Sequence, residues 1–282
     1  MSHALTWLDV FSATPLAGNQ LAVVHDADDL DHATMLGFAR ETRLSETTYV
    51  QRATEDGADY RNRIWFPRGE MPFAGHPSLG TAVAVAAAAQ ADAAQYVQQT
   101  GAGLQPVEVE RAGAVWRASM LQGAPLIGDE LDAGEILGAV GLSAADAHPE
   151  LPPQLMSTGL PQVVAPVRDD AALERARGDY AAMERVLVPL GVDMIIVSVI
   201  DGERARSRAL YLDLGFANED PATGSAAGSL VTYLHARGVA SRVVIEQGAQ
   251  IARPSVLHAA IEDGRARVGG DCVLVATGTL AI

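Results

Sequence analysis

A short motif that occurs twice constrains the fold of this chain more than any other feature. Residues 70–76 read EMPFAGH and residues 219–225 read EDPATGS, so Glu-x-Pro-x-x-Gly followed by a polar residue appears in both halves. Three further stretches repeat in the same order: 159–167 echoes 18–25, 193–199 echoes 46–51, and 208–214 echoes 63–69. The offsets are 141, 147, 145 and 149 residues (18 to 159, 46 to 193, 63 to 208 and 70 to 219). This near-constant separation predicts an internal duplication that builds two similar α/β units.

Each half is expected to contain one dominant helix that begins at the glycine of the motif. The first is predicted over Gly75–Ala94, because Pro77 suits a first turn and the alanine-rich body favours helix. The second is predicted over Gly224–Arg237. Residues 82–89 have no polar face, so we expect that stretch to be buried nearly all round. A curved sheet wrapped around the helix would bury it in this way.

The boundary between the two halves is expected near residues 113–123. It divides the chain into an N-terminal half, 1–118, and a C-terminal half, 119–282, with the last strand able to return to the first half. Ligand sites often lie between duplicated domains, so we expect the functional site in the interdomain cleft.

Composition excludes several classes of function. The net charge of −15 over 282 residues opposes binding to nucleic acid and to anionic membranes. All 20 basic residues are arginine, which excludes a lysine Schiff base and a Walker-A phosphate site. The one cysteine, Cys272, cannot form a disulfide within the chain and favours a reducing cytoplasm. We expect no signal peptide in MSHALTWLDVF and no membrane-spanning segment.

The two helix starts are candidate anion-binding groups. A helix N-terminus has unpaired backbone N–H groups and a partial positive charge, and a glycine there lets a ligand approach closely. Gly75 and Gly224 could therefore hold a small carboxylate from two sides. The alternative is that both glycines only make tight turns. Ser225 could likewise be a plain N-terminal capping residue.

Three titratable residues near these motifs are candidates for proton chemistry. Glu46 lies in RLSETTYV, and a carboxylate in an apolar cleft can transfer protons at carbon. His76 and Asp220 follow or precede the motif glycines. Each also has an ordinary interpretation: Glu46 as a surface residue, His76 as a structural histidine and Asp220 as the cap of a turn.

Other kinds of site are not indicated by the spacing of the residues. The seven histidines form no HxxxH or HxH pair, so no metal site is expected. TGSAAG lacks the glycine that a nucleophile elbow has two residues before its serine. GAGLQP at 101–106 has neither the third glycine nor the following helix of a dinucleotide fingerprint.

Four stretches together resemble the PhzF-type isomerases of phenazine biosynthesis. They are DVFSATPLAGNQLAVV, LSETTYV, EMPFAGHPSLGTA and NEDPATGSAAGSL, and they occur in the family's order between residues 9 and 230. The resemblance implies an α+β class and the diaminopimelate epimerase-like fold. That fold has two pseudo-symmetric halves, each a β-barrel-like sheet around a central helix. It also implies a homodimer and a reaction that needs no cofactor.

The resemblance also implies roles for the matching residues. Glu46 would be the acid/base glutamate, and His76 would orient the substrate or its proton. Asp220 and Ser225 would bind the substrate's polar groups, while backbone N–H groups of Gly75 and Gly224 would bind its carboxylate. Epimerases of this fold use two cysteines at the places held here by His76 and Ser225. The phenazine isomerase proper also has a glutamine on the helix after its DPATGS motif, and this chain has none between 226 and 237.

The sequence therefore predicts an isomerase that moves a proton between carbons of a small carboxylate, with Glu46 as general acid/base. Two other functions stay open at this point. One is a carboxylate-binding protein of the same fold that has no turnover. The other is a serine hydrolase centred on Ser225.

Overall fold

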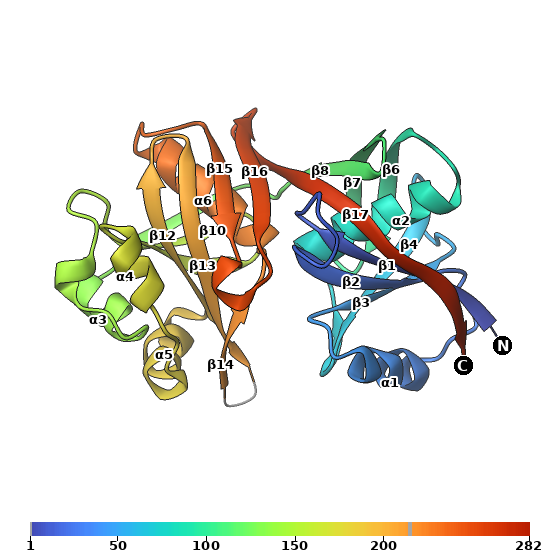
Figure 1. The fold of residues 1–282 in the computed structure, drawn as a ribbon, viewed down its shortest axis with the longest axis horizontal. Helices are drawn as coiled ribbons and strands as arrows, with labels where there is room; N and C mark the ends of the chain where they lie inside the picture. The colour runs from blue at the N-terminus through green and yellow to red at the C-terminus, as the bar shows by residue number, and fades with distance from the viewer. Residues whose placement is uncertain (1, 214–215) are drawn as a thin grey trace. The chain divides into compact units, whose positions relative to one another are not determined.

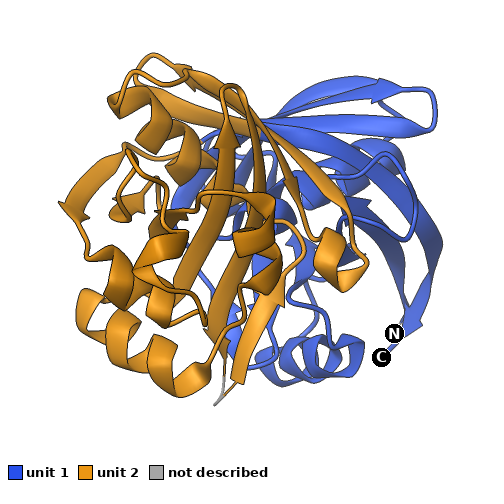
Figure 2. Cartoon of the chain, turned by 60° about the vertical axis from the view of Figure 1, so that its left-hand side comes forward, with its two compact units in different colours: residues 1–121, 269–282 blue, residues 122–268 orange. Residues whose placement is uncertain are grey.

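The computed structural model describes residues 2–213 and 216–282, which form two compact units. The first unit comprises residues 1–121 and 269–282, and the second comprises 122–268 (Figure 2). Each unit is described by itself below.

The first unit contains eight strands and two helices in succession, and the C-terminal strand joins them (Figure 1). The elements are β1 (Ser2–Val10), β2 (Asn19–Val24), α1 (His32–Thr42), β3 (Thr47–Gln51), β4 (Tyr60–Phe66), β5 (Gly69–Met71), α2 (Gly75–Ala88), β6 (Ala93–Thr100), β7 (Gly103–Ala112), β8 (Val115–Leu121) and most of β17 (Arg265–Ala281).

The strands of the first unit form a closed barrel. Hydrogen-bonded pairs connect β1 to β2, then β3, β4, β6, β7, β8 and β17, and β17 pairs again with β1. The β2–β3 and β4–β6 pairs are parallel, and each is joined by a connection that contains a helix. A closed barrel leaves no unpaired sheet edge among the strands of the ring.

Helix α2 fills this barrel. It packs against β1, β2, β3, β4, β6, β7 and β8, and its residues from His76 to Ala84 are buried. Gly80 is required by this fit, because a Cβ there would lie 2.6 Å from the Leu21 side chain. A polar pair between α2 and β3, Thr48 Oγ1 to Thr81 Oγ1 at 2.8 Å, satisfies both buried hydroxyls. The predicted β-barrel-like sheet around a central helix is confirmed for this unit.

The predicted end of the helix, at Ala94, is wrong. The helix stops at Ala88, Gln90 adopts a left-handed φ of 56°, and strand β6 begins at Ala93. Alanine favours helix wherever it stands, so an alanine-rich run does not mark its own end. Here the pairing of β6 with β4 and β7 decides the conformation of residues 93–100.

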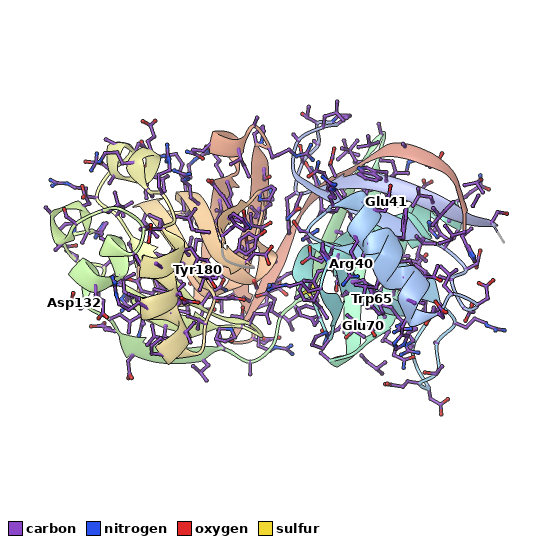
Figure 3. All side chains as sticks on the ribbon, turned by 90° about the horizontal axis from the view of Figure 1, so that it is seen from below. Arg40, Glu41, Trp65, Glu70, Asp132 and Tyr180 are labelled. Carbon is purple, nitrogen blue, oxygen red and sulfur yellow. The ribbon has the colours of Figure 1, made fainter. Side chains whose placement is uncertain are left out.

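Helix α1 covers the outer face of strands β3 and β4. Met35 and Ala39 pack with Val24, Tyr49 and Trp65 in one buried cluster. Figure 3 shows Trp65 beside this helix, on which Arg40 and Glu41 are labelled. The Tyr49 hydroxyl donates to the Met35 carbonyl oxygen at 2.7 Å, so this aromatic ring is buried without leaving its polar end unpaired.

The second unit repeats the first in order and in pairing. Its elements are β9 (Leu126–Glu130), α3 (Ala133–Gly138), η1 (Ala144–Asp146), β10 (Gln154–Ser157), β11 (Pro161–Pro166), α4 (Asp170–Arg175), α5 (Tyr180–Leu187), η2 (Val188–Leu190), β12 (Met194–Asp201), β13 (Arg204–Asp213), β14 (Phe216–Asp220), α6 (Gly224–Ala236), β15 (Arg242–Gln247), η3 (Ala249–Ile251), β16 (Ser255–Glu262) and the start of β17.

The pairings of the two units correspond one to one. From β10 to β16, two pairs are parallel, β11–β12 and β13–β15. The other four are antiparallel: β10–β11, β12–β13, β13–β14 and β15–β16. The series from β1 to β7 has the same directions. Helix α6 packs against β10, β11, β15 and β16, as α2 does in its barrel. The predicted duplication is therefore confirmed, and α3, α4 and α5 pack on the outer face of the second sheet.

The glutamate that opens each repeated motif pairs with an arginine on the preceding strand. In the first unit Arg63 of β4 donates to both carboxylate oxygens of Glu70, at 2.6 and 2.5 Å. In the second, Arg208 of β13 donates to both oxygens of Glu219, at 3.0 and 2.5 Å. The shared glutamates therefore hold β5 and β14 against their neighbours immediately before each helix start.

Within residues 2–213 and 216–282, the helices are all too short or too polar to cross a membrane.

Candidate functional site

Glu46 and His76, two of the predicted site residues, lie in contact within the first unit. Glu46 directly precedes β3, and His76 is the second residue of α2. The Nε2 atom of His76 lies 3.5 Å from Oε2 of Glu46, and the two side chains are only 7% and 15% exposed. The fold therefore places a carboxylate and an imidazole together in a poorly solvated position.

Burial makes His76 a neutral partner for Glu46. Loss of hydration lowers the pKa of His76 to about 3, and a backbone hydrogen bond with Gln20 opposes this only in part. The contact is thus between a neutral imidazole and a carboxyl group, although its distance would also suit an ion pair. A neutral histidine can donate one proton and accept another at its two ring nitrogens.

Asn19, the first residue of β2, contacts the imidazole ring of His76. Its amide Nδ2 lies 3.3 Å from Nδ1 of His76. This contact holds the imidazole ring from the side of Nδ1, while Nε2 is the ring nitrogen nearest Glu46. The sequence analysis did not single out this residue. The available sequence signal was the Gly-Asn-Gln of the first repeated stretch. Gly18 has a φ of 72°, and a Cβ there would lie 2.4 Å from the Val10 carbonyl oxygen.

Asp220, Gly224 and Ser225 lie close together in the second unit. Asp220 ends β14, and Gly224 and Ser225 are the first two residues of α6. The Thr223 hydroxyl donates to Oδ2 of Asp220 at 2.5 Å. Both Asp220 and Ser225 are half-buried, so these side chains are packed yet accessible to a small ligand.

The first turns of α2 and α6 have no side-chain cap. The capping positions are occupied by Ala74 and Thr223, and neither makes a capping hydrogen bond through its side chain. The capping role considered for Ser225 is therefore wrong, because Ser225 is the second helical residue. Gly75 and Gly224 have helical backbone, so neither is a turn glycine that needs a positive φ. Uncapped first turns are suited to binding an anion.

In the part of the chain that the structure describes, neither the cysteine thiol nor a cluster of metal ligands gives a second candidate site. Burial raises the pKa of the Cys272 thiol to about 12, so this thiol is a poor nucleophile. Among the described residues, no three histidine, cysteine, aspartate or glutamate side chains gather as a metal site would require.

The low pKa of His76 predicts a specific pH dependence of stability. Between pH 6.5 and about 3 the unfolded chain binds a proton at this histidine that the folded chain does not. The free energy of unfolding should therefore fall as the pH falls through this range, by up to ~1.4 kcal/mol per pH unit for one proton. We expect His76→Asn to make the slope of the free energy of unfolding against pH shallower, by up to the contribution of one proton. Urea unfolding between pH 4 and 7 measures this slope.

The exposed residue His258 provides the control for this experiment. His258→Asn should leave the slope unchanged, because this side chain is exposed to solvent in the folded chain as well as in the unfolded chain. Equal slopes for wild type and His76→Asn would show that His76 is not held neutral by burial.

Comparison with known proteins gives one family. The family model for phenazine biosynthesis-like proteins (PhzC-PhzF) matches residues 8–278. The trans-2,3-dihydro-3-hydroxyanthranilate isomerase of Pseudomonas aeruginosa is 36% identical over 270 residues, covering 94% of this chain and 93% of the relative. The enzyme of the same name from Pseudomonas fluorescens is 37% identical over 294 residues, covering 99% and 100%.

Solved structures agree with this result. A predicted epimerase from Pseudomonas aeruginosa superimposes with a TM-score of 0.88 at 36% identity and covers 99% of both chains. A hydroxyproline epimerase from Agrobacterium vitis superimposes with a TM-score of 0.67 at 11% identity, covering 99% of this chain and 91% of the epimerase. This second likeness concerns the fold alone, and it agrees with the epimerase-like fold expected from the sequence.

Proposed function

Because the chain belongs to the phenazine biosynthesis-like family and is an isomerase, we propose that it moves a proton between two carbons of one small carboxylate substrate without a cofactor. The observation that carries this proposal is the contact between Glu46 and the neutral His76. A carboxylate next to a buried imidazole that is not charged is suited to take up a proton and to give it back.

Glu46 is proposed to act as the general acid/base. Its carboxylate removes a proton from an sp³ carbon next to an unsaturated system, and the C–H electron pair passes into that system. Glu46 then returns the proton to a different carbon of the same molecule, so the substrate and product are isomers and no oxidant or reductant is consumed. The His76 imidazole lies beside this carboxylate, with Nε2 3.5 Å from Oε2, and can steady it or a polar group of the substrate.

The helix starts are proposed to bind the carboxylate of the substrate. Backbone N–H groups of Gly75, Gly224 and Ser225 are in uncapped first turns, where fixed donors stabilise negative charge. The same donors would stabilise the charge that develops in the enolate-like transition state. Asp220 and His76 would hold the amino or hydroxyl groups of the substrate.

The names of the relatives suggest the class of substrate. Trans-2,3-dihydro-3-hydroxyanthranilate is a cyclic carboxylate with an amino group, a hydroxyl group and a conjugated diene. We propose a substrate of this chemical class, a small unsaturated ring acid with polar substituents. The absence of a glutamine between 226 and 237 leaves the substituents open.

Proton exchange in deuterated water tests the proposal. Wild-type protein is incubated with trans-2,3-dihydro-3-hydroxyanthranilate and with a panel of small ring carboxylates, and carbon-bound hydrogen is followed by NMR. Deuterium incorporation with conversion to an isomer is the expected result. Ligands that raise the melting temperature but never exchange a proton would instead identify a binding protein.

Ser225→Ala separates the isomerase from a serine hydrolase. If Ser225 only binds the substrate, its removal should raise KM by up to about ten-fold and leave kcat within about three-fold of wild type. A nucleophilic serine would give a loss of kcat by several orders of magnitude. Steady-state kinetics of the proton transfer, followed by NMR, decides between these outcomes.

A further inference from the structure

The turn that precedes α6 is held by a glutamine from a strand distant in the sequence. Gln247 is the last residue of β15, and its side chain is buried. Its amide Nε2 lies 2.8 Å from the Asp220 carbonyl oxygen and 3.1 Å from Oγ1 of Thr223. Both amide protons are thus used on the motif that contains Asp220.

These contacts determine the direction of each hydrogen bond. The Asp220 carbonyl oxygen only accepts, so the amide group of Gln247 must present Nε2, not Oε1, to the turn. Thr223 Oγ1 then accepts from Nε2, and its own proton is left for Oδ2 of Asp220, 2.5 Å away. The result is a directed chain from Gln247 through Thr223 to the Asp220 carboxylate.

The residue after Gln247 shows that the end of β15 is fitted to this turn. Gly248 has a φ of 78°, and a Cβ there would lie 2.5 Å from the Pro221 carbonyl oxygen and 2.4 Å from that of Arg253. A side chain at this position would therefore displace the turn, and the left-handed backbone also favours glycine. Gln247 and Gly248 therefore both lie in close contact with the turn at residues 220–223.

We propose that Gln247 is a positioning residue for the reaction, which acts by holding Thr223 and the Asp220 carboxylate in the orientation that receives the substrate. This inference rests on the proposed function, in which Asp220 binds a polar group of the substrate. Gln247 itself contacts the turn through its side-chain amide and acts on the Asp220 carboxylate through Thr223. Loss of the chain would free the Asp220 side chain to rotate, so the effect should fall on substrate binding more than on the proton transfer.

Another buried glutamine of the same unit provides a matched control. Gln162 of β11 donates through Nε2 to Ser229 Oγ on α6 at 2.8 Å. Its burial and its hydrogen bond to a hydroxyl resemble those of Gln247, but it contacts no residue of the Asp220 turn among the bonds described. A purely structural effect of losing a buried glutamine should therefore appear equally in both.

The test compares Gln247→Leu, Thr223→Val, Thr223→Ser and Gln162→Leu with wild type. The probe is trans-2,3-dihydro-3-hydroxyanthranilate, with KM and kcat from NMR, the dissociation constant from calorimetry and the melting temperature from circular dichroism. We expect Gln247→Leu and Thr223→Val to raise KM and the dissociation constant about ten-fold with a smaller change in kcat. Thr223→Ser should restore both, and Gln162→Leu should lower the melting temperature without affecting either constant.

Wild-type binding constants in both Gln247→Leu and Thr223→Val would overturn the inference, as would an equal effect in Gln162→Leu. If wild type binds the probe without exchanging a proton, the proposed function fails, and the dissociation constants still measure the role of Gln247. The two failures are therefore distinguishable. Thr223→Val keeps the side-chain shape, so the test does not depend on the folding of Gln247→Leu.

Discussion

Replacing Glu46 with glutamine should lower kcat for proton transfer by about 100- to 10,000-fold, the contribution typical of a general acid/base. Glutamine keeps the size of the side chain and can keep the contact with Nε2 of His76, which lies 3.5 Å from the carboxylate in the wild type. It cannot accept a proton from carbon. The loss should therefore appear in kcat, while binding of the substrate changes little.

The measurement is deuterium incorporation by NMR, together with the dissociation constant of the same compound. Glu41→Gln is the matched control, because Glu41 is an exposed residue of α1 in the same unit (Figure 3). It should exchange protons as the wild type does. Normal turnover in Glu46→Gln would show that another group transfers the proton, and loss of binding in that variant would assign Glu46 to substrate recognition instead.

Replacing Arg208 with leucine should lower the free energy of unfolding by about 3–5 kcal/mol, because it leaves a buried carboxylate without its partner. The Arg208 and Glu219 side chains are 4% and 8% exposed. The same guanidinium group also donates to the carbonyl oxygens of Leu173, Glu174 and Ala176, where α4 ends. Its removal therefore leaves polar groups of two elements unpaired.

Arg204→Leu is the control for this prediction. Arg204 lies on β13, as Arg208 does, and pairs with Glu246 of β15 at 2.6 Å, but these two side chains are 64% and 49% exposed. Exposed pairs contribute at most about 1 kcal/mol. Urea unfolding measures both variants. The double variant Arg208→Leu with Glu219→Leu should recover part of the loss, because no buried charge then remains. Equal destabilisation by Arg204→Leu and Arg208→Leu would contradict the argument.

Much of the fold could be predicted because the same sequence pattern occurs in both halves of the chain. The repeated motif and the near-constant offsets of the repeated stretches indicated two similar units, and each dominant helix begins at the motif glycine, Gly75 or Gly224. The lack of a polar face over residues 82–89 indicated a helix inside a curved sheet, and α2 is surrounded by the strands of its barrel. What the pattern could not give was the end of that helix at Ala88, since alanine is compatible with both sides of the boundary.

The candidate site was predictable by residue type but not by its supporting contacts. Glu46 and His76 were named from motifs 30 positions apart, and their contact agrees with that choice of residues. The partners that orient the candidates, Asn19 for His76 and Gln247 for Thr223 and Asp220, were not singled out. Asparagine and glutamine occur throughout such a chain, and nothing local distinguishes a buried amide that contacts a site from one on the surface.

The sequence by itself determined the two similar units, the two helix starts and the chemical types at the site, because these depend on the internal repeat and on local patterns of apolar spacing, glycine and charge. The fold class followed from the resemblance of its motifs to a known family. Only the tertiary structure decided that the motif glutamates Glu70 and Glu219 bind arginines, and that His76 is buried deeply enough to be neutral. Those properties depend on which strands become neighbours. Parallel pairing joins β2 to β3 and β13 to β15 across long connections, so the residues that meet there are remote in sequence, and their burial and hydrogen bonds exist only once the sheets have formed.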